Sequence, residues 1–103
     1  MTVYILAQLR FTDEAAYRRY QSRFFDVFRR FDGRFLVADE RPEVLEGDWD
    51  RDKVVLMSFP DAEAARRFHE SPEYQAIAVD RKAGADAIVL QVRGFEGGGS
   101  DSA

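Results

Sequence analysis

Two segments of the sequence resemble each other without a gap, and this internal repeat constrains the fold more than any other feature. Residues 11–20 (FTDEAAYRRY) align with residues 59–68 (FPDAEAARRF), with Phe, Asp, Ala and two Arg at equivalent positions. In each copy an apolar run leads into an aspartate, Asp13 or Asp61, that can cap a helix. Two such strand-to-helix units predict two β-α-β halves. The predicted fold class is therefore α+β, a ferredoxin-like β-α-β-β-α-β sandwich with a four-stranded antiparallel sheet and its helices on one face.

The four strands are expected at residues 3–11, 34–38, 53–59 and 87–93. Each is rich in Val, Ile, Leu or Phe, which are residue types that fit a pleated and partly buried surface. Pro42 cannot occupy a central ladder position, so the second strand is expected to stop at a turn and to resume at residues 43–46. The following segment, residues 47–52, is expected to be a polar loop that contains the single tryptophan.

Capping residues predict where the helices begin and end. The first helix is expected to begin after Thr12 or Asp13 and to carry aromatic residues at steps of three and four, which would face the sheet. Asp32-Gly33 is expected to end it, with Gly33 as the C-terminal cap. In the second half, Ser71-Pro72 is expected to end one helix and begin another, because serine is a good N-cap and proline suits the first helical turn. Gly84 is expected to end that last helix.

Alternation along the strands predicts an apolar surface on the sheet face that the helices leave uncovered. In one of the two assignments of the faces, that surface carries Tyr4, Leu6, Val54, Leu56, Ile88 and Leu90. A bare apolar face of roughly several hundred Å² is unusual for a soluble monomer. A two-fold dimer is the simplest closed arrangement that covers it. We therefore expect a homodimer through the sheet face, in which two sheets pack face to face as a dimeric α+β barrel.

Length and composition limit the classes of partner. The chain has 103 residues, which suits one domain, expected at residues 1–95 and followed by a flexible Gly/Ser tail at residues 96–103. Its net charge of −4 gives no attraction to nucleic acid or to an anionic membrane, so neither is expected as a partner. The apolar N-terminus lacks the basic lead and the length of a signal peptide or membrane span. The absence of cysteine excludes disulfides and thiolate chemistry, and it makes a cytoplasmic location the default expectation.

Three short motifs carry a resemblance to a known family. They are GRFLV at residues 33–37, LEGDW at residues 45–49 and SPEYQ at residues 71–75. In this order they resemble the signatures of the domain of unknown function family 1330, within the dimeric α+β barrel superfamily, over roughly residues 2–94. The resemblance implies a ferredoxin-like subunit and a barrel-forming homodimer, and it implies no established activity. Superfamily relatives include cofactor-independent monooxygenases, small-ring isomerases, haem-degrading enzymes and stress-responsive barrels, and these functions transfer only as analogies of fold.

His69 is the only histidine and the candidate catalytic residue. An imidazole can act as acid and base near neutral pH. The alternative is a surface histidine that the C-terminal end of a helix stabilises. His69 also departs from the family pattern, because related sequences often carry an aromatic residue at this position. One histidine without cysteine argues against a zinc or copper site, although Asp and Glu could supply further ligands, and no metal or other cofactor is expected.

Five further residues are candidates for binding a small molecule: Gln8, Tyr17, Trp49, Tyr74 and Arg93. The two tyrosines are expected on inward helix faces, where a cleft lined by aromatic rings would suit a flat, partly apolar ligand. Trp49 follows a polar loop and could cover such a cleft or pack on a partner subunit. Gln8 and Arg93 belong to strands that should be adjacent, and together with His69 they would orient the ligand.

These observations favour a small homodimer of uncharacterised function that binds a partly apolar or aromatic small molecule in a cleft between its sheet and its helices. If the protein is an enzyme, it is expected to work without a cofactor. The competing interpretation is a non-catalytic structural or accessory dimer whose aromatic residues only fill the core. The sequence contains no nucleophile elbow, phosphate loop or nucleotide fingerprint that would identify a reaction.

Overall fold

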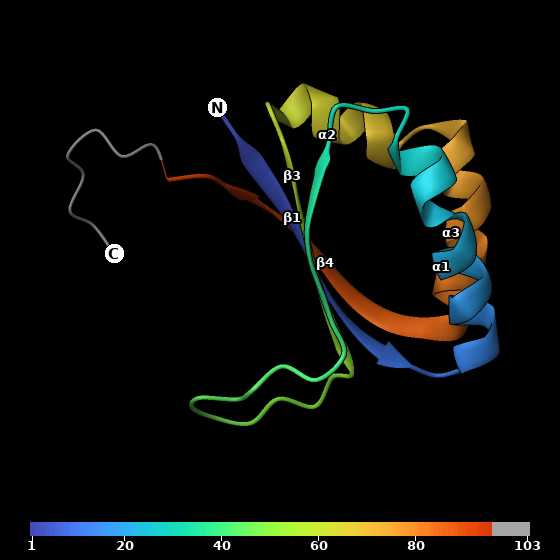
Figure 1. Cartoon of the computed structure of the whole chain (residues 1–103), viewed down its shortest axis with the longest axis vertical. Helices are drawn as coiled ribbons and strands as arrows, with labels where there is room; N and C mark the ends of the chain where they lie inside the picture. The colour runs from blue at the N-terminus through green and yellow to red at the C-terminus, as the bar shows by residue number, and fades with distance from the viewer. Residues whose placement is uncertain (96–103) are drawn as a thin grey trace.

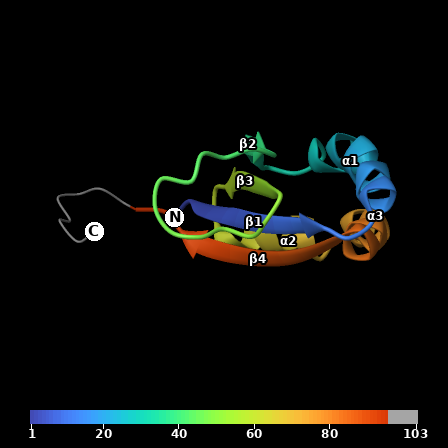
Figure 2. The same cartoon turned by 90° about the horizontal axis from the view of Figure 1, so that it is seen from below.

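A four-stranded antiparallel sheet forms the centre of the fold in the computed structural model, which describes residues 1–95. The elements in chain order are β1 (Val3–Phe11), α1 (Glu14–Phe28), β2 (Arg34–Asp39), β3 (Lys53–Phe59), α2 (Ala62–His69), α3 (Pro72–Gly84) and β4 (Ala85–Arg93). The strand order is β2-β3-β1-β4, and all neighbouring strands are antiparallel (Figure 2). This confirms the predicted ferredoxin-like arrangement. The predicted tail, residues 96–103, lies outside the described residues.

The helices form a single layer on one side of the sheet. In Figure 1 the sheet is seen nearly edge-on, with α1, α2 and α3 on one side of it and the segment between β2 and β3 projecting on the other. Helices α1 and α3 pack against each other, and α2 lies over the end of the sheet where β3 leads into it. One face of the sheet is therefore left without a covering layer in the single subunit.

Strand alternation determines which residues face the helices. Along β1, Val3, Ile5, Ala7 and Leu9 are buried on the helix side. Their partners on β3 are Phe59, Met57, Val55 and Lys53, so the helix side of β3 begins with a cation. The opposite face carries the apolar set predicted above: Tyr4, Leu6, Val54, Leu56, Ile88 and Leu90. On β4, 44% of Ile88 and 45% of Leu90 are exposed in the subunit.

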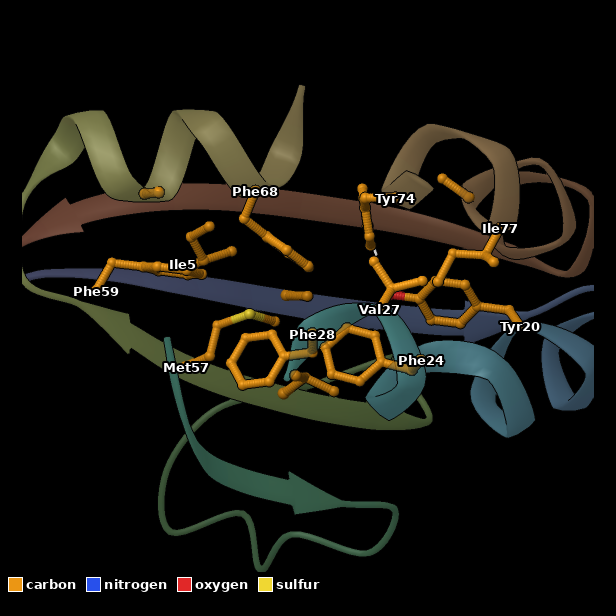
Figure 3. Packing of buried hydrophobic residues seen from close by; sticks show 14 of the residues in the cluster. Ile5, Tyr20, Phe24, Val27, Phe28, Met57, Phe59, Phe68, Tyr74 and Ile77 are labelled. Carbon is orange, nitrogen blue, oxygen red and sulfur yellow. Dashed lines mark hydrogen bonds between the residues drawn. The ribbon is translucent and has the colours of Figure 1, made fainter. Parts of the chain in front are cut away.

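Aromatic side chains fill the space between the sheet and the helices (Figure 3). Phe68 from α2 is almost completely buried, and its ring lies 5.6 Å from Phe59 of β3 and 5.4 Å from Phe28 of α1 between centroids. The Phe24 and Phe28 rings stack along α1 with centroids 5.1 Å apart. Rings in such offset or edge-to-face contacts contribute about 0.5–1.5 kcal/mol per pair beyond the area that they bury.

The predicted caps form, and the two copies of the repeat use the same residue in the same way. Asp13 Oδ1 accepts a hydrogen bond from the Ala16 amide at 3.3 Å, and the equivalent Asp61 Oδ1 accepts one from the Ala64 amide at 2.8 Å. Ser71 caps α3, as predicted, because its Oγ accepts from the Tyr74 amide. The same Oγ donates to the carbonyl of Phe68 at 2.8 Å, which ties the end of α2 to the start of α3.

Two local predictions are wrong. Helix α1 ends at Phe28 and is capped by Arg29 in a right-handed conformation, so Gly33 is not its cap. Glycine is needed at position 33 for a tertiary reason, since a Cβ there would lie 2.6 Å from Phe28 Cζ and 2.8 Å from Phe59 Cε1. Residues 43–46 form no strand, because β2 ends at Asp39, whose side chain accepts a hydrogen bond from the Arg41 amide and forms a turn.

Gly84, at the end of α3, lies against the start of α1. Its carbonyl accepts hydrogen bonds from the amides of Thr12 at 2.9 Å and Asp13 at 3.1 Å, just before α1 begins. A Cβ at this position would lie 2.3 Å from the Tyr17 amide nitrogen and 2.7 Å from the Asp13 carbonyl oxygen. The obstacle is backbone, which cannot rotate away as a side chain can.

We therefore predict that Gly84→Ala lowers the free energy of unfolding by about 3 kcal/mol, because it forces α3 away from the start of α1. Urea denaturation measures the change. Ala83→Ser, at the exposed neighbouring position, is the matched control and should change the free energy by less than about 0.5 kcal/mol. A Gly84→Ala protein as stable as the wild type would show that this approach is not close in solution.

Candidate functional site

A cavity of about 90 Å³ lies between the sheet and the helices α1 and α3. It has room for several water molecules or one small organic group. Its floor is formed by helix-facing residues of the sheet, and small side chains such as Ala7 and Ala38 leave the space open. The polar residues on its wall are Tyr17, Tyr20, Gln21, Lys53, His69, Tyr74 and Arg81. We call this space the inter-layer cavity.

A second, more open groove of about 320 Å³ lies along β4 and α2. It shares Ile5, His69 and Val89 with the wall of the inter-layer cavity. Val89 is 39% exposed although it faces the helix side of the sheet, which shows that the helices leave this part of β4 uncovered. The groove therefore adjoins the cavity at these three shared residues.

The tyrosine hydroxyl groups form the polar end of the aromatic layer. The hydroxyl oxygens of Tyr20 and Tyr74 are 3.0 Å apart and share a hydrogen bond (Figure 3). Burial raises the pKa of Tyr20 well above its ordinary value. Burial, assisted by the negative charge of Glu40, also raises the pKa of Tyr17 to about 12. At neutral pH both residues are therefore uncharged and able to donate a hydrogen bond.

Lys53 is a site residue that the sequence analysis missed. Only 4% of it is exposed, although lysine is almost never fully buried without a partner. Its Nζ lies 4.9 Å from the centroid of the Tyr17 ring and 3.7 Å from Glu40 Oε2. Burial lowers the pKa of Lys53, and the carboxylate of Glu40 partly offsets that effect. The period-two pattern of residues 53, 55, 57 and 59 could have placed this lysine on the core side of its strand.

Glu40 is held at the edge of the cavity by Arg18. The Arg18 guanidinium donates from Nη1 to Glu40 Oε2 at 2.6 Å and from Nη2 to Oε1 at 2.9 Å, which is a bidentate pair. Hydrogen bonding from Arg18 lowers the pKa of Glu40. The same guanidinium lies over the rings of Phe11 and Tyr17, with its Cζ 5.2 Å and 5.8 Å from their centroids. Within residues 1–95, Glu40 is the carboxylate that pairs with Lys53, and it also pairs with Arg18.

The structure brings three of the predicted site residues together. His69 ends α2, has an exposed side chain, and lies on the wall of both the cavity and the groove. Its ring is 5.7 Å from that of Tyr74 between centroids, and its carbonyl accepts a hydrogen bond from Gln75 Nε2. Tyr17 and Tyr74 lie on the same cavity wall from α1 and α3.

The other three predicted residues lie elsewhere. Gln8 is on the uncovered face of the sheet, where its Oε1 accepts a hydrogen bond from Trp49 Nε1 at 3.0 Å. Trp49 is half-buried there and covers no cavity on the helix side. Arg93 pairs with Val3 at the far end of β4 and does not line the cavity. Strands β1 and β4 are adjacent as expected. However, their register places Gln8 and Arg93 far apart along the strands, and the alternation of side chains places them on opposite faces of the sheet.

The described residues offer no preformed metal site. Within residues 1–95, no group of three or more His, Cys, Asp or Glu side chains is arranged to hold a metal ion. None of the helices in the same residues is long and apolar enough to cross a membrane.

Comparisons with known proteins support the family resemblance and the fold. The family model of the domain of unknown function DUF1330 matches residues 2–95, and no curated protein matches the sequence. A protein of unknown function from Rhodopseudomonas palustris has a similar structure, with a TM-score of 0.77, 19% identity, and 92% of this chain and 83% of that chain covered.

Two further solved structures are informative. SnoaB from Streptomyces nogalater, a cofactor-independent oxygenase, has a TM-score of 0.68 at 18% identity, with 96% of this chain and 98% of that chain covered. A dimeric ferredoxin-like protein of unknown function from Thermobifida fusca has a TM-score of 0.63 at 14% identity, with 88% and 89% covered. At these identities the similarity shows a shared fold.

The raised pKa of Tyr17 predicts how stability depends on alkaline pH. The unfolded chain loses the tyrosine proton near pH 10, whereas folded Tyr17 keeps it until about pH 12. Stability is therefore fully present below pH 10 and falls as the pH rises to 12, by about 2–3 kcal/mol for this residue. Tyr17→Phe removes the titrating group and should reduce the fall in the free energy of unfolding by that amount.

Urea denaturation at a series of pH values measures this difference. Tyr4→Phe, on the opposite face of the sheet, is the matched control and should keep the fall seen in the wild type. If Tyr17→Phe loses as much stability as the wild type between pH 10 and 12, Tyr17 is accessible to water and does not bound an enclosed cavity.

Proposed function

We propose that this chain, which belongs to the DUF1330 family of domains of unknown function, forms a homodimer through the uncovered face of its sheet and binds a small, partly aromatic molecule in the inter-layer cavity of each subunit. The observation that carries the proposal is the cavity itself. An aromatic layer that is otherwise tightly packed leaves a space at the end where its polar groups gather.

The composition of the cavity wall supports a ligand with a flat apolar body. Phe24 and Tyr20 supply aromatic surface from α1, and Val55 and Ala7 supply a smooth aliphatic floor from the sheet. A few polar groups stand among these apolar side chains, which is the usual composition of a small-molecule site.

His69 is our candidate for proton transfer to the bound molecule. It lies where the cavity meets the groove, and its exposed ring can exchange protons with water on one side and with a ligand on the other. A reaction of this kind needs no cofactor. SnoaB, which shares the fold, is a cofactor-independent oxygenase, and this supports the proposal that such a scaffold can carry out chemistry with side chains alone.

The dimer is supported by the uncovered sheet face. Leu6 and Leu56 lie at its centre, beside the exposed Ile88, Leu90 and Val92 of β4. Burial of apolar surface favours association by about 25 cal/mol per Å², before the cost of lost freedom is subtracted. Structural neighbours from Thermobifida fusca and Bacteroides fragilis are described as dimeric. A second copy presents the same apolar face, so a two-fold axis lets each copy cover the other.

We predict that a large side chain at the boundary between the cavity and the groove weakens the binding of a neutral aromatic probe. Val89→Trp fills the boundary between cavity and groove, and it should weaken the binding of indole at least about tenfold. Val79→Trp is the matched control, because Val79 is 65% exposed on α3 and lines neither space. Proton NMR titration measures both affinities.

The same titration reports on His69 directly, since the single histidine gives one set of ring signals. These signals should move as indole binds to the wild type. Saturation with indole that leaves them unmoved would remove His69 from the site. Equal binding of indole to both tryptophan variants would show that the probe does not enter through this opening.

We also predict that one charge on the uncovered face separates the subunits. Leu90→Glu should convert a micromolar dimer into a monomer in sedimentation velocity, because a carboxylate would be buried against an apolar surface. Val79→Glu places the same charge on a helix and should leave the dimer intact. Trp49 lies on the same face as Leu90, so its fluorescence should shift with Leu90→Glu only. A wild-type protein that sediments as a monomer at micromolar concentration contradicts the dimer.

A further inference from the structure

Arg81 carries an unsatisfied hydrogen-bond donor on the wall of the inter-layer cavity. It lies in the last turn of α3, on the face that also carries Tyr74, Ile77 and Ala78. Its Nε atom is buried, and within residues 1–95 no group accepts a hydrogen bond from it. It is also the one buried side-chain nitrogen or oxygen of these residues that lacks a partner. A buried charged donor is costly to leave unpaired, so this position favours an acceptor that comes from outside the chain.

The charges around the cavity are unbalanced in the same direction. Among residues 1–95, Lys53 and Arg81 are the lysine and the arginine on its wall, and no aspartate or glutamate of these residues lines it. Glu40, beside Lys53, is already held by both oxygens in its pair with Arg18. Asp80, next to Arg81 in the chain, pairs with Arg19 instead, at 3.4 Å. Each of these two acids therefore pairs with an arginine, and Glu40 also offsets part of the charge of Lys53, whereas Arg81 has no such partner.

Neutral hydroxyl groups complete the surroundings of Arg81. The positive charge of Arg81 lowers the pKa values of Tyr17 and Tyr20, but burial raises them by more. The phenol groups therefore keep their protons. In the pair of Tyr20 and Tyr74 one hydroxyl donates to the other, and the second hydroxyl keeps a proton that it can donate to a ligand. An arginine with neutral donors beside it binds an anionic oxygen more strongly than a neutral one.

We propose that the molecule bound in the inter-layer cavity is an organic carboxylate, with one carboxylate oxygen accepting a hydrogen bond from Arg81 Nε and the apolar body resting against Phe24 and Val55. This inference rests on the proposed function, since it names the class of ligand for the same site. It assigns to Arg81 the recognition of the anion. Lys53, which already pairs with Glu40, adds positive potential from its position over the Tyr17 ring.

The test compares two probes of nearly equal shape, benzoate and benzamide, of which only the first is charged. Benzoate should bind the wild-type dimer at least about tenfold more tightly than benzamide. Arg81→Gln should weaken benzoate binding about tenfold and benzamide binding by less than about twofold. Lys82→Gln removes the same charge from an exposed position one residue away, and it should change neither affinity by more than about twofold.

A signal of the wild-type protein makes the test independent of how well a variant folds. In a ¹H–¹⁵N spectrum the Arg81 Nε–H resonance should move downfield when benzoate binds and stay nearly unchanged with benzamide. Arg81→Gln should also melt at the wild-type temperature or above it, because it removes a buried donor that has no partner. A purely structural role for Arg81 would instead lower the melting temperature and leave the preference for benzoate intact.

The outcomes separate this inference from the proposed function. If indole or benzamide binds and benzoate binds no more tightly, the cavity is a ligand site but the carboxylate inference is wrong. If benzoate binds and neither Arg81→Gln nor the Nε–H resonance responds, the anion lies elsewhere and the inference is equally wrong. If indole, benzamide and benzoate all fail to bind, both the inference and the proposed function are contradicted.

Discussion

The packing of Phe68 against Phe59, Phe28 and Tyr74 is the contact on which the rest of the structure depends. These partners come from β3, α1 and α3, with ring centroids 5.6, 5.4 and 4.5 Å from that of Phe68. One side chain of α2 therefore joins the sheet to the whole helix layer. Dense packing around it fixes the separation of the two layers, because interiors of this density do not deform smoothly. The cavity lies beyond this anchor, where the sheet contributes small residues such as Ala7 and Ala38.

The layer between sheet and helices changes character along its length. Phenylalanine fills the end nearest α2, and the tyrosine side chains lie toward the end where α1 and α3 pack side by side (Figure 3). Lys53 and Arg81 line the same cavity as these tyrosines. Apolar packing at the first end contributes stability that offsets the cost of the unsatisfied Arg81 Nε at the second end. Such a division is expected of a scaffold that keeps a site ready for a ligand. Arg81, whose Nε is the one buried side-chain nitrogen or oxygen of residues 1–95 without a partner, accordingly lines the cavity.

The sequence was sufficient for the topology and insufficient for the site. Asp13, Asp61 and Ser71 act through hydrogen bonds to amides three residues away, so local patterns predict them well. Gln8 and Arg93 depend on the register between distant strands, and no local pattern fixes that register. The end of α1 was misplaced because Gly33 is required by the rings of Phe28 and Phe59, not by the helix. Lys53 is not among the predicted site residues, although the alternation of side chains along its strand places it on the core side.

The central claim is that each subunit keeps an open cavity between its sheet and its helices while the uncovered sheet faces meet in a dimer. A crystal structure determined under xenon pressure tests both parts at once, because xenon enters apolar cavities without needing a specific ligand. The account predicts a xenon atom among Phe24, Val55 and Ala7 in each subunit, with the two sheets packed face to face across a two-fold axis. A layer with no xenon, in which side chains have closed the space, would contradict it.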